Sequence, residues 1–247
     1  YTLNNDEYKD VIYKSKNKKK KILFKNKLQF RNVDFYYTNR NKKIFSNFSL
    51  EIKKKEFVGI FGPSGSGKST FNNLLTGLLN PKSGEILVDG INIKENIRNW
   101  QNKIGFVSQT PFFSNDTIKN NILFGENPKN IRFKDFDEII KLSQLKGLTD
   151  SLPHGVNTII GEKGINLSTG QLQRISIARA LYRKPELLIL DEATNALDEE
   201  NERLIFNFIK KLKGKITTII VSHKKDNFYF CDKICKVFKN SFKILRN

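Results

Sequence analysis

The sequence predicts an α/β domain with a mostly parallel sheet, and three observations carry this prediction. Two short, continuous apolar runs, at residues 187–190 and 216–221, have the character of strands that are covered on both faces. A glycine-rich turn at residues 62–70 lies between an apolar run and a segment with helical character. The 247 residues, 38% hydrophobic and 28% charged, are enough to bury a core of this kind.

The remaining elements follow from the spacing of apolar residues. Residues 1–27 are expected to be a basic linker and residues 28–247 the domain itself. Strands are expected at residues 28–35, 48–52, 57–61, 85–91 and 104–108, and helices at residues 69–79 and 171–183. Helical periodicity over residues 118–146 indicates an inserted helical lobe, with outer boundaries at about residues 112 and 180.

Composition excludes several classes of protein. No uncharged apolar run approaches the roughly 18 residues that a helix needs to cross a bilayer, and residues 1–10 are polar and charged, unlike a signal peptide. Cys231 and Cys235 are too few for a disulfide framework and lack the further ligands of a zinc site. Because the sequence contains no Met, even at position 1, we expect a segment of a longer polypeptide.

The formal charge of +19, from 44 Lys and Arg against 25 Asp and Glu, has three interpretations. A biased composition combined with a nearby anionic membrane surface is favoured, because lysines occur over the whole length and the densest run, residues 14–21, lies at the amino end. A solvated tether explains that run equally well. Nucleic acid is not favoured as a partner, because no aromatic residue interrupts the basic stretch at residues 16–21.

The glycine-rich turn fits the phosphate-binding pattern G-x4-G-K-[ST]. Its residues are Gly62, Pro63, Ser64, Gly65, Ser66, Gly67, Lys68, Ser69 and Thr70. Glycines let successive backbone N–H groups turn inward around a polyphosphate, and the helix that follows presents the positive end of its dipole. Lys68 is expected to reach the outer phosphates and Ser69 to hold Mg2+, so the chain is predicted to bind a nucleoside triphosphate.

Both of the most apolar runs are followed by polar residues: Asp191 and Glu192 after the first, and His223 shortly after the second. Ligands of open α/β sheets gather at the carboxyl ends of parallel strands, so these side chains are expected to converge on the glycine-rich turn. An Asp in this position commonly holds Mg2+ through water, and the next carboxylate can orient or deprotonate a water beside the γ-phosphate. Asp191 and Glu192 fit these two roles.

A second turn of small residues, at residues 167–171, precedes a predicted helix and is a second candidate anion site. The ordinary interpretation is that Ser168 caps this helix. Two phosphate sites far apart in one sequence suggest, however, that one of them serves the nucleotide of another molecule.

Taken together, the motifs resemble the nucleotide-binding domain of an ATP-binding cassette (ABC) transporter over roughly residues 28–240. Residues 167–171, LSTGQ, resemble the family signature LSGGQ, and residues 187–192 resemble its Walker B strand. The resemblance implies a P-loop NTPase fold with a RecA-like, mostly parallel sheet core, an antiparallel β subdomain and an inserted α-helical subdomain. It also implies ATP as the nucleotide and Mg2+ as the cofactor.

The resemblance assigns roles by position. Tyr37 matches the aromatic residue that stacks on adenine, Gln109 the glutamine that meets Mg2+, Asp198 the dimer-contact loop and His223 the histidine that contacts the γ-phosphate; Ser168, Gly170 and Gln171 belong to the signature. Catalysis is thus assigned to Glu192, His223 and Gln109, and metal binding to Ser69, Gln109 and Asp191. The ordinary alternatives are a core aromatic for Tyr37, a turn residue for Gln109 and a structural histidine for His223.

Residues 108–113, 117–122 and 161–164 resemble exporters whose membrane and ATPase domains share one polypeptide. In these proteins the position of Glu162 contacts an intracellular coupling helix. A looser likeness, at residues 95–105, is to flippases of lipid-linked oligosaccharides. The expected partners are a second nucleotide-binding domain, identical or homologous, and transmembrane domains of the same polypeptide, with this segment at the cytoplasmic face of the membrane.

One residue departs from the family pattern. Thr169 occupies the first glycine of the central pair in the signature, where its Cβ is expected to weaken or alter closure on a partner's nucleotide. The main rival function is a soluble ABC ATPase that acts on nucleic acid or ribosomes. A small-molecule P-loop kinase is a third interpretation, but it leaves residues 167–171 without a purpose.

Overall fold

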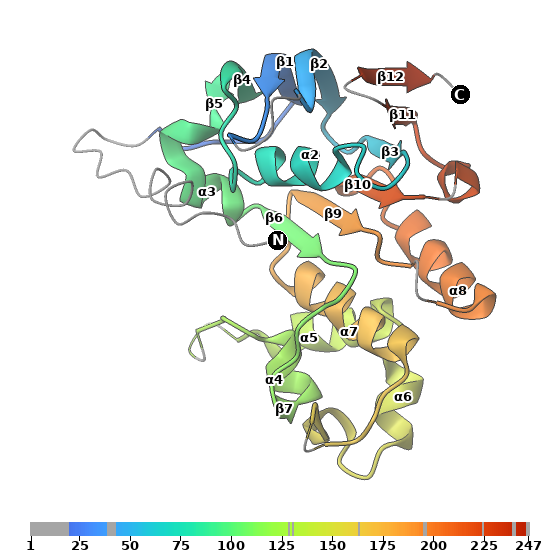
Figure 1. Cartoon of the computed structure of the whole chain (residues 1–247). Coiled ribbons are helices and arrows are strands. Elements are labelled where there is room, and N and C mark those ends of the chain that lie inside the picture. The colour runs from blue at the N-terminus through green and yellow to red at the C-terminus, as the bar shows by residue number, and fades with distance from the viewer. Residues whose placement is uncertain are drawn as a thin grey trace. The chain divides into compact units, whose positions relative to one another are not determined.

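The structure is a computed structural model that describes residues 20–38, 43–127, 129, 131–162, 164–194, 197–223, 225–238 and 241–245. These residues belong to two compact units, one within Tyr1–Ile104 and His223–Asn247, the other within Gly105–Ser222 (Figure 1). We call them unit 1 and unit 2. Most of the predicted linker, including residues 14–19 of the basic run, lies outside the described residues.

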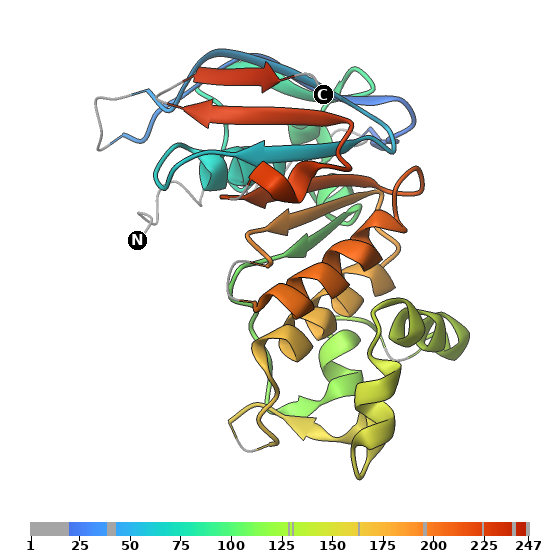
Figure 2. The same ribbon diagram turned by 90° about the vertical axis from the view of Figure 1, so that its right-hand side faces the viewer.

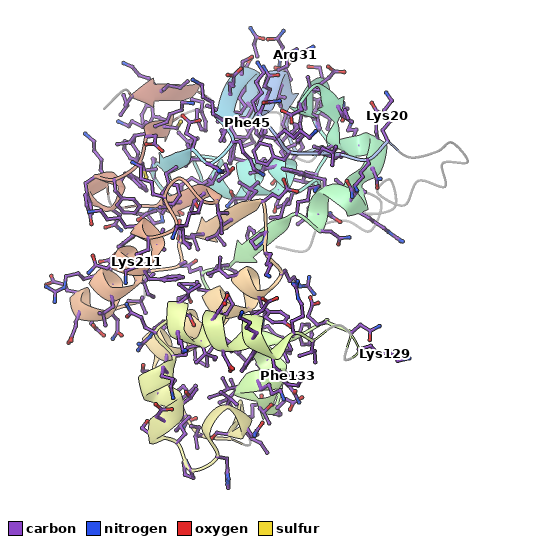
Figure 3. All side chains as sticks on the ribbon, turned by 180° about the vertical axis from the view of Figure 1, so that it is seen from behind. Lys20, Arg31, Phe45, Lys129, Phe133 and Lys211 are labelled. Carbon is purple, nitrogen blue, oxygen red and sulfur yellow. The ribbon has the colours of Figure 1, made fainter. Side chains whose placement is uncertain are left out.

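Unit 1 contains an antiparallel sheet with the strand order β2-β1-β4-β5. Its strands are β1 (Lys27–Phe35), β2 (Phe45–Lys53), β4 (Ser83–Val88) and β5 (Ile91–Asn92). Phe30 of β1 stands opposite Leu50 of β2 and Ile86 of β4, so these apolar side chains share one face of the sheet. Phe45, only 1% exposed, lies in the interior of unit 1, whereas Arg31 points outward (Figure 3). The predicted antiparallel β part is thus confirmed.

A second group of strands positions the glycine-rich turn of unit 1. Strand β3 (Phe57–Phe61) is parallel to β11 (Lys233–Phe238), and β12 (Ser241–Leu245) is antiparallel to β11 (Figure 2). The carboxylate of Asp232 accepts a hydrogen bond of 2.9 Å from the backbone N–H of Phe57. This bond fixes the start of β3 beside β11, so the turn leaves the carboxyl end of a strand that is held from both its start and its side.

Helix α2 (Lys68–Leu75) follows the turn and is shorter than the helix expected to reach residue 79. Gly77 has a φ of 70°, and the N–H groups of Leu78 and Leu79 both donate to the carbonyl oxygen of Asn73. Bonds of this kind end helices at a left-handed glycine. The short helices in the described part of unit 1 are η1 (Ile93–Asn96), α3 (Ile97–Gln101) and η4 (Lys225–Phe228).

The chain is packed in the interior of unit 1 from Ile22 onward, ahead of the predicted first strand. Ile22 and Phe24 are 0% and 3% exposed, and the Phe24 ring meets Trp100 edge-on at 6.0 Å. Three successive backbone N–H groups, those of residues 25–27, donate to the Asp89 carboxylate at 2.6 to 3.1 Å. Burial opposes ionisation of Asp89, but these bonds outweigh it and hold its pKa below the ordinary value.

The central strands of unit 2 are the two most apolar runs of the sequence. Strand β9 (Leu187–Asp191) is parallel to β10 (Thr217–Ser222), with Ile189 opposite Ile219, and β6 (Ile104–Val107) lies on the other side of β9. Every residue of β10 is buried, as expected of a strand covered on both faces. The mixed α/β fold with parallel and antiparallel strands is thus confirmed.

Helices make up most of the remainder of unit 2. They are α4 (Ile118–Ile122), α5 (Phe133–Leu142), α6 (Lys146–Ser151), α7 (Thr169–Tyr182) and α8 (Glu199–Lys210), with the short pieces β7 (Asp116–Thr117), η3 (Gly155–Asn157) and β8 (Ile159–Ile160). Ile118, Phe136 and Ile175 belong to one buried cluster that joins α4, α5 and α7. Over the described ranges, no helix combines the length and the hydropathy that a membrane span requires.

Candidate functional site

The glycine-rich turn of unit 1 lies between β3 and α2, as its pattern requires. Gly65 and Gly67 have φ angles of 72° and 111°, in the left-handed region that favours glycine. A Cβ at Gly67 would lie 2.8 Å from Cγ2 of Ile44, and a Cβ at Gly62 would collide with the carbonyl oxygen of Val237. Conformation and space therefore both demand glycine in this turn.

Lys68 lies inside the turn. It is 5% exposed, and its Nζ donates to the carbonyl oxygens of Gly62 and Pro63 at 2.9 and 3.1 Å. Oγ of Ser66 is buried and has no hydrogen-bond partner among the described residues. A buried hydroxyl with an unused hydrogen bond, beside an ammonium at the start of a helix, fits the oxygens of a phosphate chain. Ser69 is exposed at the same helix end.

Tyr37 lies beside the end of this turn. Its hydroxyl is 3.1 Å from Oγ1 of Thr70, and its ring meets Phe35 edge-on at 5.0 Å. The side chain is half-buried, so it takes part in packing and still presents some surface. Its stacking on adenine stays a prediction.

Asp191 and Glu192 lie together at the carboxyl end of β9 in unit 2, and both are half-buried. Glu192 has a φ of 52°, although it carries a side chain. Its N–H donates to the carbonyl oxygen of Val221 on β10 at 2.9 Å, which holds this conformation. Non-glycine residues with such φ values are uncommon and concentrate at functional sites.

The signature turn begins helix α7. The hydroxyl of Ser168 accepts from the N–H of Gln171 at 3.3 Å, and Oε1 of Gln171 accepts from the N–H of Ser168 at 2.8 Å. This reciprocal arrangement is a capping box, so the ordinary interpretation of Ser168 as a helix cap holds. Thr169 is exposed as the first residue of the helix, and Gly170 behind it is buried. No acidic residue in this first turn offsets the positive end of the helix dipole.

The other predicted site residues are exposed and lie in connecting segments: Gln109 after β6, Glu162 after β8, Asp198 before α8 and His223 after β10. Nε2 of Gln173 on α7 donates to the carbonyl oxygen of Ser108 at 3.4 Å. This bond links the signature helix to the residue that precedes Gln109.

The site residues divide between the two units. Unit 1 contains the glycine-rich turn, Tyr37 and His223, whereas unit 2 contains Gln109, Ser168, Gly170, Gln171, Asp191, Glu192 and Asp198. Each unit thus carries one turn at a helix start with the character of an anion site.

Sequence reasoning missed two residues that hold the signature turn. Nε of Arg174 donates to the carbonyl oxygen of Gly170 at 3.4 Å, and burial lowers the pKa of this guanidinium. The side chain of Asn201 on α8 lies against Gly170. The bond from Arg174 spans four residues within α7, whereas the contact with Asn201 is tertiary, so neither spacing nor periodicity could have revealed the latter.

Comparisons with known proteins agree with this site. Residues 45–195 match the protein family described as ABC transporter. The chain is 42% identical over 212 residues to ABC transporter B family member 2 of Dictyostelium discoideum. The aligned segment covers 85% of this chain and 15% of that protein. It is also 42% identical over 211 residues to an ATP-dependent lipid A-core flippase of Pasteurella multocida, covering 84% of this chain and 36% of that protein.

A solved structure of a bacterial Atm1-family ABC exporter with ATP bound superposes with a TM-score of 0.78 at 33% identity, over 87% of this chain and 38% of that chain. The chain therefore spans less than half the length of each of these relatives. The family match alone covers more than half of the 247 residues, and it includes both the glycine-rich turn and the signature. The chain belongs to the ABC transporter family and corresponds to the nucleotide-binding ATPase domain of its exporters.

Proposed function

We propose that the chain is the ATP-hydrolysing motor of an exporter and that two copies, or one copy and a homologous partner, enclose two ATP molecules. The observation that carries this proposal is the pair of anion-binding turns, one before α2 in unit 1 and one at the start of α7 in unit 2. The triphosphate of one ATP needs a single glycine-rich turn. The second turn is then available to a nucleotide held by another copy.

Binding rests on the glycine-rich turn. The backbone N–H groups and Lys68 hold the β- and γ-phosphates, Ser66 donates its unused hydrogen bond, and Tyr37 stacks on adenine. The oxygens of Ser69, Gln109 and Asp191 are of the type that Mg2+ prefers, and the ion, when bound, neutralises charge on the phosphates.

Hydrolysis depends mainly on positioning and charge stabilisation. Glu192 orients a water molecule for in-line attack on the γ-phosphorus and accepts its proton, while the bond from that phosphorus to the β-phosphate oxygen breaks and ADP leaves. His223 contacts the γ-phosphate. The hydrogen bond from Glu192 to Val221 supports this role, because it fixes the backbone from which the carboxylate extends.

Closure of the pair completes each site. Ser168, Gly170 and Gln171 of one copy cover the triphosphate held by the other, and Asp198 contacts the opposite copy. Thr169, exposed in the first turn of α7, presents a Cβ to that nucleotide where the family has glycine. We therefore expect weaker closure than the LSGGQ sequence provides.

The motor would act on transmembrane domains of the same polypeptide, at the cytoplasmic face of a membrane. Gln109 and Glu162 are the proposed contact points, and both are exposed in connecting segments of unit 2. The names of the relatives, which include an exporter and a lipid A-core flippase, support transport as the work that ATP drives. Residues 1–27 are proposed as the linker to the membrane part, with its last residues, from Ile22, packed in unit 1.

The rival function, a soluble ABC ATPase acting on nucleic acid or ribosomes, finds no support among these relatives. The charge of +19 nevertheless favours contact with nucleic acid, so binding to nucleic acid should be measured. Binding to double-stranded DNA or RNA that persists at physiological ionic strength and weakens steeply with added salt would favour the rival.

Glu192→Gln tests the proposed function. The substituted amide keeps the shape of the side chain but cannot accept a proton, so we expect turnover to fall by at least about a hundredfold while ATP still drives dimer formation in sedimentation experiments. Glu138→Gln, at an exposed site on α5, is the matched control and should leave both properties intact. Unchanged turnover in Glu192→Gln would refute the assignment of the base, and failure of ATP to form dimers would refute the paired site.

A further inference from the structure

Asn201, the third residue of α8, holds the carboxylate of Asp198 from two sides. Its backbone N–H donates to Oδ1 of Asp198 at 2.9 Å, and its side-chain Nδ2 donates to Oδ2 at 2.7 Å. These bonds, the backbone one first, keep the pKa of Asp198 below its ordinary value. An exposed carboxylate is therefore ionised, and both of its oxygens are held by Asn201.

The opposite face of Asn201 lies against the signature turn. A Cβ at Gly170 would lie 2.8 Å from both Cγ and Oδ1 of Asn201 and 3.1 Å from its Cβ. Helices α7 and α8 lie side by side within unit 2 (Figure 2), and at this point the side chain of Asn201 leaves no room for a Cβ at residue 170. The side chain of Asn201 thus fills the space between Gly170 and Asp198.

Gly170 is held from its carbonyl side as well. Nε of Arg174 donates to its carbonyl oxygen at 3.4 Å, and Nη1 of Arg174 donates to the carbonyl oxygen of Gln144 at 3.3 Å. The bond from Arg174 to Gln144 opposes a shift of the turn away from α8, so a group added at residue 170 acts on Asn201. It would displace Asn201, and with it the hydrogen bond to Asp198.

Helix capping does not account for this arrangement. Asp198 caps α8 by accepting from the backbone N–H of Asn201, a bond that almost any residue at position 201 would supply. The Nδ2 bond and the contact with Gly170 require the Asn side chain itself. These two contacts join the signature turn to the segment of Asp198, and in the proposed function both segments face the same partner copy.

We propose that Asn201 is a positioning residue that couples the signature turn to Asp198, so that one copy presents Gly170 and the Asp198 carboxylate to its partner as a single rigid surface. This inference rests on the proposed function, because the coupling has a purpose only if a second copy closes on that surface. It assigns Asn201 no contact with the nucleotide.

The first experiment uses the chain with Glu192→Gln as the parent, in which ATP-dependent dimers accumulate. Asn201→Ala in this parent should weaken ATP-dependent dimerisation roughly tenfold, the size expected from losing one hydrogen bond to a charged group. Binding of a fluorescent ATP analogue, measured at concentrations that keep the chain monomeric, should not change. Asn207→Ala, at an exposed site on the same helix, is the matched control and should alter neither quantity.

The second experiment tests the contact itself. Gly170→Ala alone forces Asn201 away, whereas Gly170→Ala combined with Asn201→Gly leaves room for the added methyl group. Each single variant raises the dimer dissociation constant by some factor, and independent effects would multiply in the double variant. If Gly170→Ala acts by displacing Asn201, the double variant should dimerise at least about threefold more tightly than this product predicts. Multiplicative losses would overturn the coupling, because they would mean that Gly170→Ala acts on the nucleotide directly.

The failures of the two proposals differ in these measurements. If the Glu192→Gln parent forms no ATP-dependent dimer, the proposed function fails and the role of Asn201 falls with it. If the parent dimerises but Asn201→Ala behaves like Asn207→Ala, only the positioning role is overturned. A loss of analogue binding in Asn201→Ala would also overturn it, because the residue would then act on general folding rather than on closure.

Discussion

The variant Asn121→Asp replaces the side-chain NH2 group with an oxygen at a site that is 0% exposed. Nδ2 of Asn121 donates to the carbonyl oxygens of Ser114, Asp116 and Thr117 at 3.0, 3.2 and 3.1 Å. Its Oδ1 accepts from the N–H of Ser114 at 3.0 Å and from Nη2 of Arg179 at 3.3 Å. In the variant, a carboxylate oxygen would face three carbonyl oxygens in the packed interior of unit 2.

The cost follows from these bonds. A buried acceptor that loses its donor costs about 1 to 3 kcal/mol. The carbonyl oxygen of Ser114 keeps the N–H of Asp116 as a donor at 2.8 Å. A protonated carboxyl group can donate to one of the other two carbonyls, which leaves one without this donor and predicts a loss of about 1 to 3 kcal/mol. Because whole domains are stable by only about 5 to 15 kcal/mol, this single exchange should remove a clearly measurable part of the stability of the fold.

Urea denaturation followed by circular dichroism measures the loss. Asn207→Asp makes the same chemical change at an exposed site on α8 and should cost less than about 0.5 kcal/mol. A loss below about 1 kcal/mol at pH 7, equal to that of the control, would refute the reasoning.

Three further predictions concern unit 1. Asp89→Asn should raise the rate of hydrogen exchange over residues 20–27, after correction for intrinsic rates. In the unmodified chain the same rise should appear as the pH falls through the lowered pKa of Asp89. The ionised carboxylate stabilises the fold above the ordinary pKa of Asp, and this contribution is lost on protonation. Unchanged exchange in Asp89→Asn would contradict this. Gly67→Ala should abolish binding of a fluorescent ATP analogue, because φ is 111° at this residue and Ile44 crowds the added Cβ. Gly65→Ala should only weaken binding, because no atom lies within 4 Å of its Cβ. Equal effects of the two variants would contradict the crowding at Gly67. Desolvation raises the pKa of Cys235 to about 12. Iodoacetamide should therefore modify this thiol in urea but not in the folded chain at neutral pH. Rapid labelling of Cys235 in the folded chain would contradict its burial.

The features that sequence predicted well are local in the chain. The glycine-rich turn, with its strand before and helix after, is encoded by neighbouring residues, and so is the capping box of Ser168 and Gln171. The central strands β9 and β10 were predictable because a strand covered on both faces needs an unbroken apolar run.

Most of the features that sequence missed depend on contacts between distant segments. The end of α2 is a local exception: apolar spacing continues past Leu75, but the left-handed Gly77 and the backward hydrogen bonds to Asn73 end the helix. Residues 25–27 gave no sign of packing, because the carboxylate that holds them belongs to Asp89. The contact of Gly170 with Asn201 likewise exists only once α7 and α8 have packed together.

A mixing experiment tests the paired site most directly. Lys68→Ala should disable the glycine-rich turn, and Ser168→Glu should set a negative charge against a partner's triphosphate at an exposed position where a helix tolerates an acid. Each variant alone should hydrolyse ATP at a small fraction of the normal rate. In an equal mixture half of the pairs are mixed and each of these has one intact site, so about a quarter of the normal rate should return. No recovery in the mixture, or full activity of Ser168→Glu by itself, would contradict the account.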